Sequence, residues 1–329
     1  MDVRIHPPDS LFNTRLKLNG MTQQHLSNRE IPLSGALFTG FLCTLFGANA
    51  VAIKYSLSGI GAFTAAGIRF SIAAVAIYFW ARFTGRPFAL KKGQASQLLF
   101  ISIVFTMQLG LLYLGLEKTS ASRGTLMVNL QPFFLLLLAH WFIPGDRITK
   151  KKILGLIMGA AGMVLVFSGK KGVTADVQIG DLMILTTSFL WAVNTAYTKR
   201  IIHLFSPFQI VFYPMLFCIP IFLAAGFLWD ADMIIHLDGK VLSALLYQSL
   251  VTASFGFVAW NTMLLKYGAV ALHSFIFIMP ITGVLLGGLI LGEPITWELL
   301  LALALIVSGI VIVNFWSGRY SQLFPTRGI

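Results

Sequence analysis

Ten long apolar stretches are the feature that most limits how this chain can fold. A helix that crosses a bilayer needs about 20 mostly apolar residues, and ten segments of the 329-residue chain meet that need. These segments are 34–56, 61–82, 96–116, 120–143, 152–168, 179–198, 207–229, 241–265, 269–291 and 296–316. The sequence therefore predicts an all-α integral membrane protein with ten transmembrane helices.

The composition excludes the soluble classes of protein. Hydrophobic residues make up 57% of the chain and charged residues only 11%, whereas about a quarter of an ordinary soluble chain is charged. So few charges cannot cover so much apolar surface in water, which rules out a soluble enzyme or a nucleic-acid-binding module. Cys43 and Cys218 both lie in apolar segments, so we expect no disulfide framework, no metal site and no cofactor.

The distribution of Lys and Arg predicts the orientation of the chain. Of these 24 residues, 17 lie on the side of the two termini, and five lie on the other side: Lys118, Arg123, Lys170, Lys171 and Lys240. Because basic residues are retained on the cytoplasmic side, we expect both termini in the cytoplasm and the protein in the plasma (inner) membrane. The same bias explains the net charge of +12 without a nucleic-acid partner.

The two halves of the chain resemble each other at a nearly constant offset. Residues 46–54 and 191–199 share an aromatic-small-x-Asn-x4-Lys pattern, 145 positions apart. Further matches follow in the same order at offsets of 147 or 148: Ser102 with Ser249, Tyr113 with Trp260, Gln131-Pro132 with Met279-Pro280, Asp146 with Glu293, and Gly162 with Gly309. Ordered matches at one spacing indicate an internal duplication.

Each half holds five spans, so the second copy enters the membrane upside down relative to the first. Inverted repeats give a fold two nearly equivalent arrangements, open to opposite sides of the membrane. A duplicated scaffold that transports nothing is the alternative. The predicted divisions are a cytoplasmic tail (1–33), the first five-helix repeat (34–168), an external linker (169–178), the second repeat (179–316) and a cytoplasmic tail (317–329). Met21 is an alternative start to Met1.

These residues resemble the EamA-type ten-helix members of the drug/metabolite transporter superfamily. The resemblance rests on the pattern that opens each half, on Arg69 in the second span, on the prolines of the fourth and ninth spans, and on the acidic residue that ends those spans. It implies a secondary carrier that moves small metabolites, often outward, through a cavity lined by spans one, three, four, six, eight and nine. Phe46 and Asp146 depart from the family, which usually has Trp and Glu there.

Polar and aromatic residues follow one face of several spans. Polar side chains are unfavourable in contact with lipid, so these faces are expected to point into the protein. In span six Thr187, Trp191, Asn194 and Thr198 recur at helical spacing. We expect the substrate cavity to be lined by Asn49, Tyr113, Thr125, Asn129, Trp191, Asn194, Trp260 and His273. The alternative for the asparagines is a hydrogen bond between helices, worth about 0.6 kcal/mol, and for His273 a hydrogen-bonded structural role.

Four further residues are candidates for cavity charge or gating. Lys54 and Arg69 lie within spans, where a charge costs about 2.5–3.5 kcal/mol; they either snorkel to the outer surface or form a cationic cavity mouth that attracts carboxylates or phosphates. Pro132 and Pro280 each free a carbonyl four residues earlier. Those carbonyls either bind substrate or water, or the prolines only bend the helices.

The absence of acidic residues from the middle of every span discriminates between functions. A carrier that exchanges protons for cationic drugs usually needs a buried carboxylate, so the sequence favours amino acids or related neutral, zwitterionic or anionic solutes. Proton-coupled multidrug efflux is the alternative. An intramembrane enzyme, the competing class, would need a nucleophile and base, and the sequence holds no such motif. We therefore expect a transporter whose partners are a small-molecule substrate and the bilayer.

Two glycine pairs allow helices to approach closely. Gly155-x3-Gly159 suits an interface between helices or between two protomers, and Gly283-x3-Gly287 suits helix packing. We interpret both as packing, with a homodimer as the alternative for the first.

Replacing both Asn49 and Asn194 with Leu tests the predicted cavity. We expect the double variant to insert normally, because Leu suits a membrane helix, and to transport less than the wild-type protein, because both amides are lost. Flux into proteoliposomes at matched protein content measures the effect. Wild-type flux in the double variant would reject the assignment of these residues to the cavity.

Overall fold

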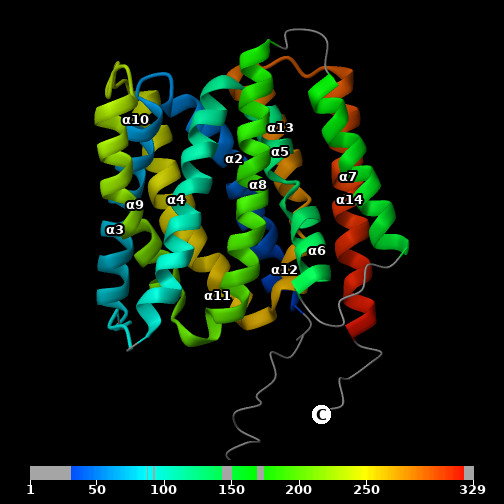
Figure 1. The fold of residues 1–329 in the computed structure, drawn as a ribbon, viewed down its shortest axis with the longest axis horizontal. Helices are drawn as coiled ribbons and strands as arrows, with labels where there is room; N and C mark the ends of the chain where they lie inside the picture. Colours follow the sequence, from blue (N-terminus) through cyan, green and yellow to red (C-terminus); the bar gives the residue numbers. More distant parts are fainter. Residues whose placement is uncertain (1–30, 87, 92, 143–149, 169–173, 322–329) are drawn as a thin grey trace, which may run out of the picture.

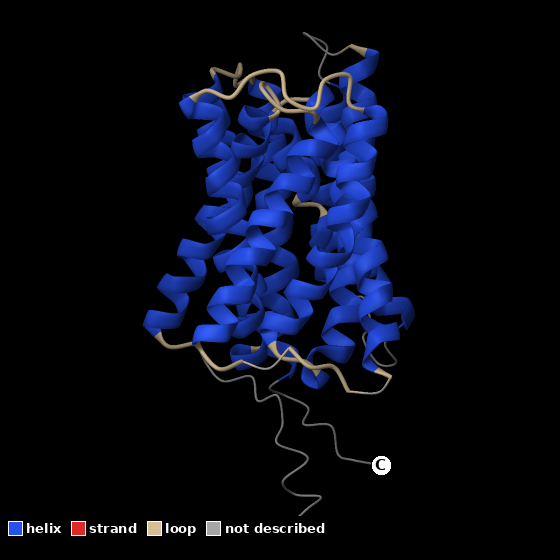
Figure 2. Ribbon diagram, turned by 90° about the vertical axis from the view of Figure 1, so that its left-hand side faces the viewer, coloured by secondary structure: helices blue, strands red, loops and turns tan. Residues whose placement is uncertain are grey.

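The computed structural model describes residues 31–86, 88–91, 93–142, 150–168 and 174–321, which form a helical bundle (Figures 1 and 2). The helices of the first half are α2 (Leu33–Ser56), α3 (Ala62–Phe83), α4 (Gln94–Lys118), α5 (Ala121–Val128), α6 (Gln131–Phe142) and α7 (Lys150–Ser168). Those of the second half are α8 (Ala175–Ile201), η1 (Ile202–Leu204), α9 (Pro207–Trp229), α10 (Gly239–Leu246), η2 (Tyr247–Gly256), α11 (Phe257–Tyr267), α12 (Ala269–His273), α13 (Ile278–Leu291) and α14 (Trp297–Ser321).

Within these described ranges, nine helical segments are long and apolar enough to cross a membrane. The pair α5 and α6 occupies the remaining predicted span, 120–143. Helix α8 begins at Ala175 rather than at 179, and α14 continues to Ser321 rather than ending at 316. Most of the two predicted tails lies outside the described residues, as do residues 169–173 of the predicted external linker and Asp146.

The two halves run in opposite directions through the bundle. Helix α2 starts at the lower end in Figure 1, whereas α8 starts at the upper end. The most extensive helix pairings join one half to the other: α7 with α14, α4 with α8, α3 with α9, and α2 with α13. The inverted repeats are therefore interleaved, so both contribute to the walls of any space between them.

Large apolar side chains cover the outside of the bundle as well as filling its interior. Phe83 and Leu289 are 85% and 80% exposed, whereas Leu42 and Phe70 are fully buried. Water would not tolerate so much contiguous apolar surface, and lipid tails can cover it. The outer surface thus agrees with the membrane location.

The fourth predicted span is not one continuous helix. Helix α5 ends at Val128 and α6 begins at Gln131, with a turn at 129–130. Pro132 has no N–H and cannot donate to the Val128 carbonyl, which instead accepts a hydrogen bond from the Ser188 hydroxyl of α8 at 3.2 Å. A membrane helix tolerates a break when a neighbouring helix satisfies the freed backbone group in this way.

The ninth span breaks at the equivalent place. Helix α12 ends at His273 and α13 begins at Ile278, with Pro280 in its first turn. The Ile276 carbonyl accepts a hydrogen bond from the N–H of Met279 at 2.9 Å. Both carbonyls freed by the prolines thus have hydrogen-bond partners within the protein in this conformation.

Helices α7 and α14 cross at glycines. A Cβ added to Gly309 would lie 2.8 Å from the Gly155 carbonyl oxygen and 2.9 Å from Cζ of Phe133, and a Cβ on Gly159 would lie 2.6 Å from the Phe133 ring. Cβ atoms essentially never approach other atoms below 3.0 Å, so only glycine fits these positions. The Gly155-x3-Gly159 pair is therefore used for packing within the chain.

Gly309→Ala is expected to destabilise the fold, because its methyl group would push α14 away from α7. Overpacking of this kind costs about 1–3 kcal/mol of unfolding free energy, and thermal unfolding in detergent measures the loss. Gly239→Ala is the matched control, since a Cβ there meets nothing within 4 Å. Equal unfolding temperatures for the two variants would contradict the packing argument.

Candidate functional site

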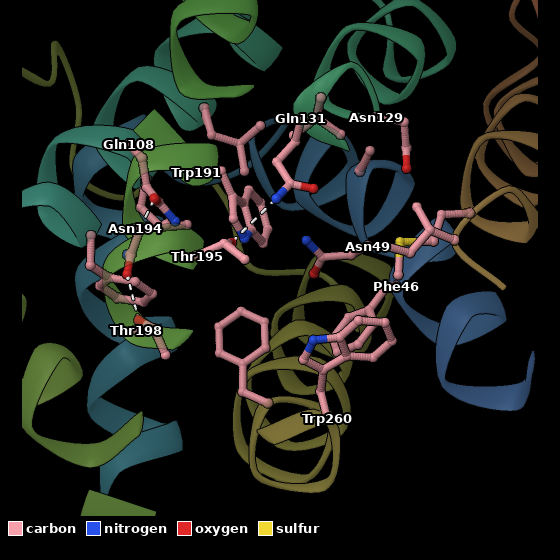
Figure 3. Close-up of a pocket in the computed structure, with 18 of the residues that line it drawn as sticks. Phe46, Asn49, Gln108, Asn129, Gln131, Trp191, Asn194, Thr195, Thr198 and Trp260 are labelled. Carbon is pink, nitrogen blue, oxygen red and sulfur yellow. Dashed lines mark hydrogen bonds between the residues drawn. The ribbon is translucent and has the colours of Figure 1, made fainter. Parts of the chain in front are cut away.

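A cavity of about 230 Å³ lies between the two halves (Figure 3). Residues from both halves line it. The first half contributes α2, α3, α4, α5, Asn129 and the start of α6, and the second half contributes α8, α9, α11 and the segment 273–279. Its volume is below the roughly 300–1,000 Å³ of drug-sized sites. The cavity is therefore sized for a small solute.

Most of the residues predicted from the sequence lie in the wall of this cavity: Asn49, Thr125, Asn129, Trp191, Asn194, Trp260 and His273. Tyr113 lies outside the wall, and its hydroxyl accepts a hydrogen bond from Arg69 at 3.3 Å. Of the four charge or gating candidates, Arg69 lines the cavity. Lys54, Pro132 and Pro280 do not belong to the described lining.

Several polar lining residues were not among those predicted. Gln108 accepts a hydrogen bond from Asn194 Nδ2 at 3.4 Å, and Gln131 donates to the hydroxyl of Thr195 at 3.2 Å. Figure 3 shows these amides on the wall shared by α4, α6 and α8. A search for side-chain amides in the middle of apolar spans would have found both glutamines, because such groups need partners in lipid.

Arg69 is the centre of the polar contacts behind the cavity. Its side chain is 1% exposed, and it donates hydrogen bonds to the hydroxyls of Tyr113 at 3.3 Å and Thr252 at 3.2 Å. The Thr252 hydroxyl in turn lies 2.8 Å from Oδ1 of Asn49. Arg69 of α3 is thus linked to α2, to α4 and to the eighth span.

The eighth span supplies its partners from a π-helical stretch, Tyr247–Gly256. Gln248 in this stretch accepts a hydrogen bond from the Tyr113 hydroxyl and donates to the hydroxyl of Ser56 at 2.9 Å. Gln248 and Thr252 are both fully buried. π-Helical turns are rare and often occur at functional sites, and this one presents Thr252 to Arg69 and Gln248 to Tyr113.

Aromatic rings form another part of the cavity wall. The Phe46 ring lies 5.9 Å from Trp260 and 5.8 Å from Phe257, measured between centroids. The His273 ring stacks on Trp260 at 6.4 Å with an interplanar angle of 20°. The described lining of the cavity therefore combines the Arg69 side chain, several amides and an aromatic surface.

Lys54 binds the end of a neighbouring helix. Its Nζ donates hydrogen bonds to the backbone carbonyls of Leu116 at 2.7 Å, Glu117 at 3.1 Å and Thr119 at 2.7 Å. A lysine at this place satisfies carbonyls that have no partner within the helix. In this conformation the ammonium group caps α4, so neither a snorkelling side chain nor a free cavity mouth describes it.

Two acidic residues at the same end of the bundle bind the start of α5. Asp181 accepts hydrogen bonds from the Thr119 hydroxyl at 2.7 Å and forms an ion pair with Arg123. Glu293 accepts hydrogen bonds from the backbone N–H groups of Ala121 at 2.6 Å and Ser122 at 2.8 Å. These contacts, with those of Lys54, hold the helix ends together above the cavity.

Among the described residues, no group of three or more His, Cys, Asp or Glu side chains is placed to hold a metal ion. Cys43 and Cys218 are both buried and free. The chemistry that the described site offers is thus hydrogen bonding, one positive charge and aromatic contact.

Comparison with known proteins gives a family match over both halves. The model of the EamA-like transporter family matches residues 33–168 and 178–315. A solved crystal structure with 19% sequence identity aligns with a TM-score of 0.66 and covers 87% of this chain and 99% of its own. That likeness shows a shared fold.

Curated relatives with similar sequences are named as transporters or pumps. Uncharacterized transporter YvbV of Bacillus subtilis is 26% identical over 85% of this chain and 91% of its own length. Two relatives are each named "Probable amino-acid metabolite efflux pump". The one from Salmonella typhimurium is 26% identical over 84% of this chain and 94% of its own. The one from Escherichia coli is 25% identical over 82% of this chain and 91% of its own.

Proposed function

Because the chain belongs to the EamA-like transporter family, we propose that it exports amino acids or related neutral, zwitterionic or anionic metabolites across the plasma (inner) membrane by alternating access. The observation that carries the proposal is the small cavity between two inverted repeats, which is where such folds bind their substrates. The two relatives named as amino-acid metabolite efflux pumps support both the substrate class and the direction.

The charge of the cavity supports this substrate class. Arg69 lines the cavity, and none of the described lining residues is Asp or Glu. A cationic drug would meet a positive charge there without a compensating carboxylate, at a substantial energetic cost. The solute that fits is neutral, zwitterionic or anionic.

The residues proposed to contact substrate are the polar and aromatic ones that face the cavity. Asn49 points toward the centre of the cavity, Trp191 and Asn194 lie on the facing wall, and Trp260 lies beside Phe46 (Figure 3). Asn129 also belongs to the lining. Amides supply both donors and acceptors, and indole rings supply apolar surface with a polar edge. Such a set suits a solute that has an apolar side chain and a polar end.

In the proposed cycle, the described conformation is closed at the external end. With both termini in the cytoplasm, the contacts of Lys54, Asp181 and Glu293 lie at the external face. Opening toward the outside then requires these contacts to break. The free energy lost when these contacts break must therefore be offset by equivalent contacts that form at the other end in the outward-open state.

The internal repeat indicates what those equivalent contacts are. Lys199 matches Lys54 at an offset of 145, and the carbonyls that Lys54 binds match those of Met263, Leu264 and Lys266 at the offset of 147 that relates Tyr113 to Trp260. In the outward-open state Lys199 caps the end of α11, as Lys54 caps α4 in the described state. Each lysine thus stabilises one of the two conformations.

Counterflow in liposomes of the purified protein tests the proposed function. We expect labelled amino acids to accumulate in liposomes preloaded with the same amino acid, with sugars, nucleosides, phosphorylated metabolites and a lipophilic cation measured in parallel. Counterflow of the lipophilic cation alone would contradict the proposal, because it would require a cavity that accepts positive charge.

Disulfide trapping tests the two lysines. In a Cys43→Ala, Cys218→Ala background, Ser122→Cys and Gly287→Cys place two Cβ atoms about 3.5 Å apart, which suits a disulfide. We expect Lys54→Met to lower the fraction of protein in which this cysteine pair is oxidised severalfold. The reason is that the change destabilises the externally closed state, in which the two cysteines are close together. Lys199→Met should raise that fraction, because it weakens the opposite state.

The matched control for this trapping experiment is Lys240→Met, since Lys240 is an exposed lysine away from these contacts. The control should leave the oxidised fraction unchanged. A decrease of the same size in the Lys54 and Lys199 variants would count against alternating roles for the two lysines.

A further inference from the structure

Arg69 carries a buried charge for which the described structure provides no counter-charge. The described ion pair joins Arg123 to Asp181, and the two hydrogen-bond partners of Arg69 are the neutral hydroxyls of Tyr113 and Thr252. Its Nε is buried without a hydrogen-bond partner. A guanidinium holds five N–H donors, so this group retains unused capacity to donate.

Arg69 Cζ lies 5.1 Å from the centroid of the Phe70 ring, which gives a cation–π contact but no counter-charge. A buried cation without a counter-charge is expensive for a purely structural residue. Hydroxyl groups offer only partial charges, whereas an unpaired ion in a low dielectric costs several kcal/mol. Hydrogen bonds to Tyr113 and Thr252 could be made by a neutral side chain at lower cost. The positive charge itself therefore needs an explanation other than packing.

The internal repeat gives the same indication. Asn49 and Lys54 each have a counterpart of the same type in the second half, at Asn194 and Lys199. Arg69 has none, because the residue 145 positions later is Pro214. Both Arg69 and Pro214 line the cavity. Since the second half folds into the same five-helix unit without this arginine, the charge is not a requirement of that unit.

The neighbourhood of Arg69 suits an anion. Asn49 accepts the Thr252 hydroxyl at its Oδ1, which leaves its amide N–H groups free to donate, and Figure 3 shows its amide nitrogen directed toward the centre of the cavity. Because Thr252 bonds both Arg69 and Asn49, the guanidinium and this amide are close enough to donate to the same group. A carboxylate matches the planar fork of a guanidinium in shape and in its single charge.

We infer that Arg69 is an anion subsite of the cavity and that the transported solute carries a carboxylate, which Arg69 and Asn49 hold while its apolar part lies toward Trp260 and Phe46. This inference rests on the proposed function and narrows it, because it excludes neutral solutes such as sugars. It also fixes the orientation of the bound solute, with its carboxylate at α3 and its apolar part at the aromatic surface.

A comparison of acids with their amides tests the subsite. In proteoliposomes, counterflow is measured for each of the twenty common L-amino acids in labelled form. For each one, the unlabelled amino acid and its carboxamide, which lacks the negative charge, are compared as inhibitors. We expect the wild-type protein to prefer the acid over the amide by about 10- to 100-fold, the value of a hydrogen bond to a charged group. Inorganic phosphate is included as a competing anion.

Variants of Arg69 identify the residue responsible. Arg69→Gln should abolish the preference for the acid, whereas Arg69→Lys should retain part of it, because a lysine keeps the charge without the fork. Arg82→Gln, the same change at an exposed position of the same helix, is the control and should keep the full preference. Size-exclusion profiles confirm that each variant is folded.

The outcomes separate this inference from the proposed function. Equal inhibition by acids and amides in the wild-type protein, stronger inhibition by phosphate than by any carboxylate, or an unchanged preference in Arg69→Gln would overturn the subsite. Counterflow of a neutral solute alone would still show that the protein is a transporter, but it would refute the inference that the solute carries a carboxylate. If no solute of the panel shows counterflow, both the proposed function and the anion subsite are refuted.

Discussion

Inside a bilayer no water is available to the backbone, so each N–H and C=O group needs a hydrogen-bond partner within the protein. This requirement decides how the interruptions in these helices are built. The break between α5 and α6 is closed by the Ser188 hydroxyl, which reaches the Val128 carbonyl. The end of α4 is satisfied by Lys54, and the start of α5 by Glu293. Broken helices occur where protein surrounds them, so the interruptions lie around the cavity and create its irregular, polar walls.

The spans and their inverted arrangement could be predicted from the sequence, because hydrophobic length and an odd number of spans per repeat are properties of the chain alone. The helix breaks could not be placed. Pro132 and Pro280 show where a backbone bond is lost, but the position of the turn depends on whether a neighbour such as Ser188 can satisfy the free carbonyl. That information exists only in the packed structure.

The structure locates the predicted site residues, but their individual contacts could not be read from the sequence. Asn49, Asn194 and Trp260 lie in the cavity wall because polar stripes on apolar helices must face something other than lipid. Lys54 and Arg69 looked equivalent as basic residues within spans, yet one binds backbone carbonyls and the other lines the cavity. The difference comes from helix ends that meet only in three dimensions, which no spacing within the sequence records.

The restriction of Arg69 to one repeat has a consequence for transport kinetics. The repeats can exchange shapes between the two open states, but the wall that carries the guanidinium cannot exchange with the wall that carries Pro214. A bound solute therefore meets a different environment on each side, so the half-saturation concentrations inside and outside need not be equal. Thermodynamic linkage requires the equilibrium of the empty carrier to compensate, so net flow in the absence of a coupled ion still follows the gradient of the solute.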